Sequence, residues 1–330
     1  MPVSANRHEF GHDASPQRTR ALLFAMLDMR RLVPLMLLAA AATTAGAQSR
    51  DTVRIDYSAA RCHSCAAWNQ PHAPARIYGN TYYVGTAGLS SILITSPRGH
   101  ILIDGTLAMS APQVMANIRA LGFRVEDIKV ILNSHAHFDH AGGIAAIQRA
   151  SHAEVAASPW SAATIERGRS DAADPQFGID LPYPPVRSVR RIADGENVRV
   201  GPLTLTAHFT PGHTPGGTSW TWDSCEHDVC LHMLYADSQT AVSAPGFLFT
   251  KNSTYPTAVP DFENGLTRLA SLPCDILMTT HPDASNLIER LAARDSGKIA
   301  TLRDPALCRD YVARSRAAVM KRFASEAGKP

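Results

Sequence analysis

Four potential metal ligands lie within six consecutive residues of this sequence. His135, His137, Asp139 and His140 form the run His-Ala-His-Phe-Asp-His. The run follows Ile128–Leu132, a short apolar segment that has the composition of a buried strand. Alternation along an extended chain would direct His135 and His137 to the same side, and Asp139 and His140 could then reach a neighbouring ion. Several imidazoles with one carboxylate favour zinc, so the run predicts a zinc site.

Two further histidines occupy comparable positions, each just after a predicted strand. His213 lies in the Gly- and Pro-rich stretch 210–217, and His281 lies in Thr-Thr-His-Pro. Either one alone is more simply explained as a hydrogen-bonded loop histidine, but the run 135–140 favours metal ligation for both. Loops at strand ends hold ligands in fixed positions, and six ligands would supply three to each of two zinc ions. His208, shortly before His213, is a weaker candidate.

The elements that would position these ligands alternate between β-rich and amphipathic segments. This alternation predicts a mixed α/β domain, with two sheets packed face to face and helices outside. The stretch 168–189 contains several prolines and is either a lip over the site or an irregular connection. We expect strands at 91–104 (two strands joined by a Pro-Arg-Gly turn), 128–132, 203–209, 219–222, 233–236 and 276–279, and helices at 111–121, 144–150 and 262–269.

Composition and the N-terminal region restrict the class of protein. Of the 330 residues, 45% are hydrophobic and 18% are charged, which allows a sizeable core and excludes general disorder. Residues 29–47 combine two arginines, an apolar run and a final Ala-Gly-Ala, which predicts a signal peptide cleaved after Ala47. A buried helix or a membrane anchor is the alternative, although the run is shorter than the roughly 20 residues of a spanning helix. We interpret residues 1–28 as an over-extended start, with Met29 as the initiator.

Cleavage after Ala47 would leave 27 basic and 26 acidic side chains, a net charge of +1. A nearly neutral protein has no electrostatic basis for binding nucleic acid, so we expect a small-molecule substrate. We also expect a periplasmic or secreted protein with no stable membrane insertion after cleavage. The oligomeric state is not predicted.

Six cysteines lie beyond the predicted leader, and export favours disulfides between them. Fifteen pairings are possible for six cysteines, of which we favour the sequential set Cys62–Cys65, Cys225–Cys230 and Cys274–Cys308. The last pair would tie a C-terminal helix to a neighbouring strand. A redox or zinc-binding role for Cys62 and Cys65 is the alternative, but no second Cys-x-x-Cys accompanies them.

The run 135–140, followed by Gly142-Gly143, resembles the signature of the metallo-β-lactamase superfamily. Five further segments are similar to class B β-lactamases of subclass 3, and the likeness extends from about Trp68 to Cys308. It implies the αβ/βα sandwich fold for residues 48–330. The five segments are 68–71 (Trp-Asn-Gln-Pro), 102–105 (Leu-Ile-Asp-Gly), 207–216, 235–238 (Tyr-Ala-Asp-Ser) and 272–275 (Leu-Pro-Cys-Asp).

The resemblance also implies a role for each site residue. One Zn²⁺ would be held by His135, His137 and His213, and a second by Asp139, His140 and His281. Ser238 and Thr240 would bind the substrate carboxylate through their hydroxyl groups, although subclass 3 commonly has serine where this chain has Thr240.

The implied activity is hydrolysis of the β-lactam amide bond, which confers antibiotic resistance. A hydroxide shared by two zinc ions about 3.5 to 4 Å apart would attack the carbonyl, and Asp139 would orient it as the catalytic carboxylate. A lactonase or thioesterase on the same metal platform is the rival, because such enzymes place a bridging aspartate one residue from the position of Asp237. A non-catalytic zinc-binding protein and a nuclease are weaker alternatives, and the near-neutral charge disfavours the nuclease.

Overall fold

The computed structural model describes residues 55–295 and 302–327. These residues belong to one compact unit, Asp51–Pro330. The other unit, Met1–Arg50, lies outside the described residues, and so do the predicted signal peptide at 29–47 and the segment 1–28 that precedes it.

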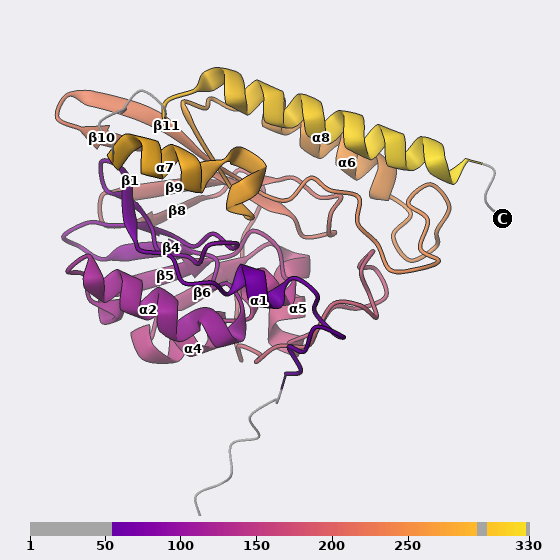
Figure 1. Cartoon of the computed structure of the whole chain (residues 1–330), viewed down its shortest axis with the longest axis horizontal. Helices are drawn as coiled ribbons and strands as arrows, with labels where there is room; N and C mark the ends of the chain where they lie inside the picture. Colours follow the sequence, from indigo (N-terminus) through magenta and orange to yellow (C-terminus); the bar gives the residue numbers. More distant parts are fainter. Residues whose placement is uncertain (1–54, 296–301, 328–330) are drawn as a thin grey trace, which may run out of the picture. The chain divides into compact units, whose positions relative to one another are not determined.

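Short strands and helices alternate along the described chain (Figure 1). The strands are β1 (Ala75–Tyr78), β2 (Thr81–Tyr83), β3 (Ile92–Ile94), β4 (His100–Ile103), β5 (Ile128–Leu132), β6 (Glu154–Ala157), β7 (Arg190–Arg191), β8 (Asn197–Val200), β9 (Leu203–Phe209), β10 (Thr218–Glu226), β11 (Val229–Ala236) and β12 (Ile276–Thr279). The α-helices are α1 (Cys65–Trp68), α2 (Ala111–Ala120), α3 (Phe138–Ala141), α4 (Ile144–Ser151), α5 (Pro159–Arg167), α6 (Ala258–Ser271), α7 (Leu287–Asp295) and α8 (Pro305–Glu326). Three 3₁₀ turns, η1 (Ala108–Ser110), η2 (Val125–Asp127) and η3 (Pro282–Ser285), complete the described elements.

The strands form two mixed sheets. The first has seven strands in the order β1-β2-β3-β4-β5-β6-β7, antiparallel from β1 to β4 and parallel from β4 to β7. The second has five strands in the order β12-β11-β10-β9-β8, and only its β11–β12 pair is parallel. Parallel pairing of β4, β5 and β6 requires crossovers, which α2 and α4 supply.

The main core lies between the two sheets. Alternate side chains of both sheets meet there, such as Ile103 and Leu132 of the first sheet and Trp220 and Met278 of the second. The opposite face of the first sheet is covered by α2, α4 and α5, and that of the second by α6 and α8 (Figure 1). The predicted αβ/βα sandwich is therefore confirmed.

Most predicted elements are found at the predicted residues. The strands at 128–132, 203–209 and 276–279 have the predicted bounds. β10 and β11 extend beyond 219–222 and 233–236, because they continue through polar residues into a hairpin that turns at His227, where φ is +53°. The stretch 168–189 contains no helix or strand.

The structure places the six cysteines in the three sequential pairs, each at disulfide distance. The S–S separations are 1.99 Å for Cys62–Cys65, 2.03 Å for Cys225–Cys230 and 2.01 Å for Cys274–Cys308. The last pair joins α8 to the segment that leads into β12. Within the described ranges, no helix is both long and apolar enough to cross a bilayer.

Candidate metal centre and substrate pocket

Four loops that follow strands carry the predicted site residues. His135 to His140 follow β5, His213 follows β9, Ser238 follows β11 and His281 follows β12. In the second sheet β9, β11 and β12 run in the same direction, so their carboxyl ends meet at one edge. This topology explains how residues distant in the sequence reach one place.

The turn before His213 depends on a close approach between loop and helix. Gly212 has φ of +136°, and a Cβ at this position would lie 2.6 Å from the ring of Phe262 on α6. Only glycine allows both the backbone conformation and the contact. Helix α6 thereby supports the loop that carries His213.

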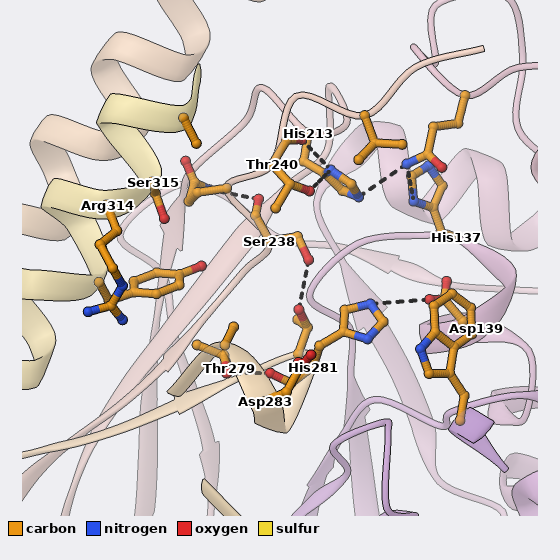
Figure 2. Close-up of a pocket in the computed structure, with 18 of the residues that line it drawn as sticks. His137, Asp139, His213, Ser238, Thr240, Thr279, His281, Asp283, Arg314 and Ser315 are labelled. Atoms are coloured by element: carbon orange, nitrogen blue, oxygen red, sulfur yellow. Dashed lines mark hydrogen bonds and ion pairs between the residues drawn. The ribbon is translucent and has the colours of Figure 1, made fainter. Parts of the chain in front are cut away.

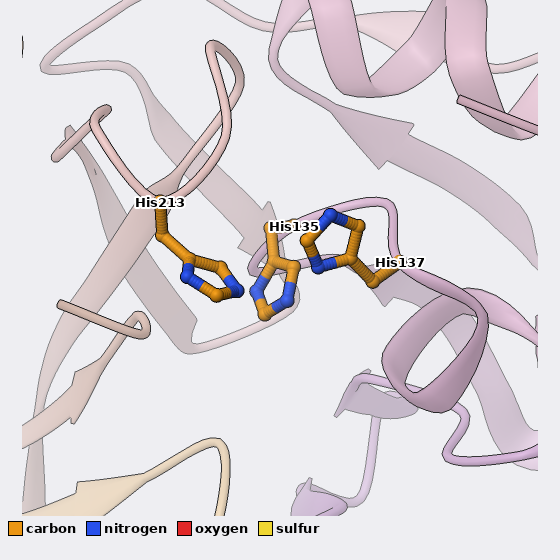
Figure 3. Close-up of side chains that lie close together, drawn as sticks. All are labelled: His135, His137 and His213. Atoms are coloured by element: carbon orange, nitrogen blue, oxygen red, sulfur yellow. The ribbon is translucent and has the colours of Figure 1, made fainter. Parts of the chain in front are cut away.

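The first group of predicted ligands consists of His135, His137 and His213. Their ligand atoms all lie within 4.8 Å of one another, and the three side chains are buried. Figure 3 shows the three rings converging from two different loops. Ring centroids are 4.8 Å apart for His135 and His213, and 5.0 Å apart for His137 and His213.

One nitrogen of each of these rings is held by a protein oxygen outside the group. His135 Nδ1 lies 2.7 Å from Asp237 Oδ1, and His137 Nε2 lies 3.0 Å from Asp174 Oδ2. His213 Nδ1 lies 2.7 Å from the Thr240 carbonyl oxygen. The Gln176 side-chain amide is the polar group nearest the other nitrogens of two of these rings, 3.3 Å from His213 Nε2 and 3.5 Å from His137 Nδ1. Outer oxygen partners of this kind orient imidazole ligands on a metal.

The second group surrounds the carboxylate of Asp139. Asp139 and His140 have ligand atoms within 4.8 Å of each other and of His135. Asp139 Oδ2 lies 3.3 Å from His140 Nε2 and 3.4 Å from His281 Nε2. His281 Nδ1 lies 3.2 Å from the Gly88 carbonyl oxygen, so its Nε2 is the nitrogen presented to Asp139. All six predicted ligands are thus brought together.

Two observations show that these residues fit a bound metal ion. Both ring nitrogens of His140 are buried, and among the described residues neither makes a hydrogen bond of regular geometry, although Nε2 lies 3.3 Å from Asp139 Oδ2. Buried polar atoms normally have a hydrogen-bond partner. Five imidazoles and one carboxylate are also a donor set that zinc prefers. Together they are consistent with a site built for zinc.

Burial and neighbouring charges hold three of these groups, His135, His213 and Asp139, in metal-binding forms. Burial, reinforced by His140, lowers the pKa of His135 well below its usual value, and burial lowers that of His213 to about 3. Burial would raise the pKa of Asp139, but His140 and His281 hold it well below the usual range. Neutral imidazole and ionised carboxylate are the forms that coordinate zinc.

Two of the predicted histidine ligands have a raised pKa instead. Burial alone would lower the pKa of His137, but the carboxylates of Asp174 and Asp180 raise it to about 10. Burial would also lower the pKa of His281, but Asp139 raises it. His137 Nε2 is the ring nitrogen that contacts Asp174, so Nδ1 is the nitrogen that could bind a metal ion. The Gln176 side chain lies between His137 and His213, with its Nε2 3.3 Å from His213 Nε2.

Four of the predicted ligands, His137, Asp139, His213 and His281, line one end of a pocket of about 610 Å³ (Figure 2). Ser238 and Thr240 also line it. The Ser238 hydroxyl lies 2.8 Å from that of Thr280, and the Thr240 hydroxyl lies 3.1 Å from His213 Nδ1. Gln176 and Asp180 line the pocket as well, so the stretch 168–189 forms a lip over the site.

Sequence reasoning missed the residues behind and around the ligands. Asp174 contacts His137 across 37 positions, and neither Gln176 nor Asp180 belongs to a recognisable motif. The α8 residues Tyr311 and Arg314 also line the pocket. The only available signal was the presence of three aspartates in the Pro-rich stretch 168–189.

Asp237 and His208 lie outside the two ligand groups. Asp237 is fully buried behind His135 and belongs to neither group, so it does not occupy the bridging position that the lactonase-like interpretation required. His208 lies on β9 with its Nε2 2.8 Å from the Thr221 hydroxyl, and it has a structural role.

Comparison with known proteins agrees with this geometry. The family described as the metallo-beta-lactamase superfamily matches residues 85–257, which is more than half of the chain. The chain belongs to the metallo-β-lactamase superfamily. The Rm3 metallo-beta-lactamase is 54% identical, with a TM-score of 0.79 over 80% of this chain and 98% of that one.

Other solved metallo-β-lactamases specify the subclass. MEM-A1, a subclass B3 metallo-beta-lactamase from a soil metagenome library, is 46% identical over 80% of this chain and all of that one, with a TM-score of 0.78. SMB-1, solved with 2-mercaptoethanesulfonate, is 44% identical over 78% of this chain and 99% of that one, with a TM-score of 0.75. These matches place the chain with the subclass B3 metallo-β-lactamases.

Curated metallo-β-lactamase relatives with other activities match less of the chain. The N-acyl homoserine lactonase AttM of Agrobacterium fabrum is 29% identical over 39% of this chain and 57% of its own length. A hydroxyacylglutathione hydrolase of Anaeromyxobacter dehalogenans is 37% identical over 28% of each chain. The matched part of the chain therefore covers 57% of the length of AttM and 28% of the length of this hydrolase.

Proposed function

We propose that this protein is a zinc-dependent hydrolase of the β-lactam amide bond. The observation that carries the proposal is the convergence of six metal-ligand side chains from three loops at the end of a 610 Å³ pocket. Near-complete coverage of subclass B3 metallo-beta-lactamases supports the same activity. A pocket that is large enough for a small molecule and reaches the predicted ligands argues against a non-catalytic zinc-binding protein.

Two zinc ions would be bound in the site. His135, His137 and His213 would hold one, and Asp139, His140 and His281 the other. Zinc bound there would supply a Lewis acid for the lactam carbonyl and would lower the pKa of a water molecule towards neutrality.

The side chains of the protein would orient the reactants. Asp139 is ionised, so its Oδ2 can accept a hydrogen bond from the attacking water and hold it in position. Ser238 Oγ and Thr240 Oγ1 would donate hydrogen bonds to the substrate carboxylate. Trp68 and Phe138 line the wall of the pocket, where they would exclude bulk water.

The proposal is tested with purified protein and a chromogenic cephalosporin. We expect hydrolysis that is abolished by a chelator and restored by zinc, and that is lost in His135→Ala and His281→Ala. His232→Ala is the matched control, because this imidazole is exposed and distant from the ligands. Unimpaired hydrolysis in both ligand variants would show that the site is assigned wrongly.

Hydrolysis of a lactone or a thioester is the second candidate, because AttM and the hydroxyacylglutathione hydrolases share part of the sequence. The outer position of Asp237, behind His135, disfavours it. A panel with one cephalosporin, one acyl homoserine lactone and one acyl glutathione separates the two. A higher kcat/KM for the lactone or the thioester would overturn the β-lactam assignment.

Export is part of the proposal. A signal peptide at 29–47, cleaved after Ala47, would deliver the enzyme to the periplasm or the medium, where it would confer antibiotic resistance. The three cysteine pairs at disulfide distance support an oxidising compartment. N-terminal sequencing of protein from a periplasmic extract should begin at Gln48, and intact protein retained in the cytoplasm would contradict export.

A further inference from the structure

Helix α8 forms one wall of the substrate pocket. Its pocket-lining residues Tyr311, Arg314, Ser315 and Ala318 are spaced as i, i+3, i+4 and i+7, so they lie on one face of the helix. Figure 2 shows Arg314 and Ser315 on this helix, on the other side of Ser238 from Asp139. The wall opposite the metal ligands is therefore helical and carries a cation.

The guanidinium of Arg314 has no hydrogen-bond or ion-pair partner within the part of the chain that the structure describes. The side chain is exposed. The two arginines that follow Arg314 on α8 are engaged: Arg316 donates to Thr267 Oγ1 and Arg322 pairs with Glu326. A guanidinium with five donors at a pocket wall is thus available to a ligand.

The charges around the pocket favour an anion at Arg314. Arg314 is the one lysine or arginine among the lining residues, whereas Asp139, Asp180 and Asp283 contribute carboxylates. Ser238 and Thr240 can donate hydrogen bonds but carry no positive charge. At the end of the pocket away from the predicted metal ligands, Arg314 is therefore the cation that could pair with a substrate carboxylate.

The backbone that carries Arg314 is held on both sides. Three residues earlier, Tyr311 Oη donates to the Asp237 carbonyl oxygen at 3.1 Å, which ties α8 to the segment that carries Ser238. Later in the helix, Arg322 Nη2 donates to Ser243 Oγ at 2.8 Å and Nη1 donates to the Ala241 carbonyl oxygen at 3.3 Å. Only the side chain of Arg314 must be ordered on binding, which lowers the entropic cost of a contact.

From these observations we infer that Arg314 binds the substrate carboxylate together with Ser238 and determines the preference for anionic β-lactams. The inference rests on the proposed function. It assigns to α8 a role in substrate specificity, and not in the chemical step, because Arg314 lies at the wall opposite the ligands.

The test compares a cephalosporin acid with its neutral methyl ester on the zinc-loaded enzyme. A hydrogen bond to a charged group changes binding affinity by a factor of about ten, or somewhat less where the side chain is exposed. Arg314→Gln should therefore raise KM for the acid about fivefold to tenfold. The values of kcat for both compounds, and KM for the ester, should change little. Arg314→Lys keeps the charge and should restore most of the preference for the acid.

Arg309→Gln is the matched control, because Arg309 lies on α8 but lines a separate groove beside Cys274. It should leave the acid-to-ester ratio of kcat/KM unchanged. An equal change for acid and ester in Arg314→Gln, or no change, would overturn the role of Arg314 while the hydrolase assignment stands. If the unsubstituted enzyme hydrolyses neither compound, the proposed function fails and the inference fails with it.

Discussion

Asp237 Oδ1 lies 2.7 Å from Nδ1 of His135, and both side chains are almost completely buried. The backbone of Asp237 is fixed as well, since its N–H donates to Ser219 Oγ and its carbonyl oxygen accepts from Tyr311. The contact directs Nε2 of His135 towards the other ligands. A residue that could be taken for a metal bridge in the sequence therefore contacts a predicted ligand from behind.

Replacing Asp237 by Asn should weaken metal binding with little effect on the fold. The amide has nearly the same shape, but one of its two terminal groups is a donor and not an acceptor, so it should hold His135 Nδ1 less firmly. Loss of such an outer partner typically costs about tenfold to 100-fold in metal affinity. Competition with a chromogenic zinc chelator measures the change.

The surface pair Asp223 and His232 provides the control for that prediction. It has the same 2.7 Å separation, but the two side chains are 62% and 54% exposed. Asp223→Asn should leave zinc affinity unchanged. Equal affinities for Asp237→Asn and the unsubstituted protein would show that the buried contact has no influence on the metal.

The zinc content should distinguish the two ligand groups. We expect about two zinc ions per protein, and about one in His281→Ala, because this substitution removes a ligand of the Asp139 group alone. His213→Ala should likewise lose the ion of the other group. Elemental analysis after gel filtration gives the stoichiometry, and one ion in the unsubstituted protein would exclude a two-zinc site.

Glu326 should make the stability depend on pH. Burial would raise its pKa, but hydrogen bonds from Thr250 and Arg322 lower it. A carboxylate whose pKa is lower in the folded state stabilises the protein above the unfolded pKa, and this contribution is lost as the pH falls through the folded value. Glu326→Gln should therefore cost about 2 kcal/mol at pH 7, and less below about pH 4.3.

Urea unfolding of the metal-free protein at pH 7 and at about pH 3.5 measures this difference. Glu263→Gln is the control, because this side chain is exposed on α6 and its substitution should leave the free energy of unfolding unchanged at both pH values. A Glu326→Gln effect that is equal at both pH values would mean that the charge of the carboxylate does not contribute.

The pair Cys274–Cys308 should stabilise the fold more than Cys62–Cys65. The pairs close loops with separations of 34 and 3 residues, and a longer loop loses more conformational freedom in the unfolded state. Replacing Cys274 and Cys308 by serine should cost about 3 to 4 kcal/mol in the free energy of unfolding. Alkylation of denatured protein should modify no cysteine without reductant, and modification of all six would disprove the pairing.

Local sequence patterns were sufficient for the framework and the ligand types. The run from His135 to His140 concentrates four ligands in one loop, so little folding information is needed to recognise it. Apolar segments such as Ile128–Leu132 and Ile276–Thr279 mark strands because burial on both faces selects β-branched and aliphatic residues. The hairpin of β10 and β11 was underestimated because its outer part is polar and exposed.

The tertiary structure decided how the ligands are held and what surrounds the substrate. Asp237 and Asp174 contact ligands that are 102 and 37 positions away in the sequence, and Arg314 reaches the pocket from the C-terminal helix. Hydrogen bonds between side chains so far apart produce no periodicity or spacing in a single sequence. They arise only when two sheets and their covering helices pack, because packing determines which distant side chains become neighbours.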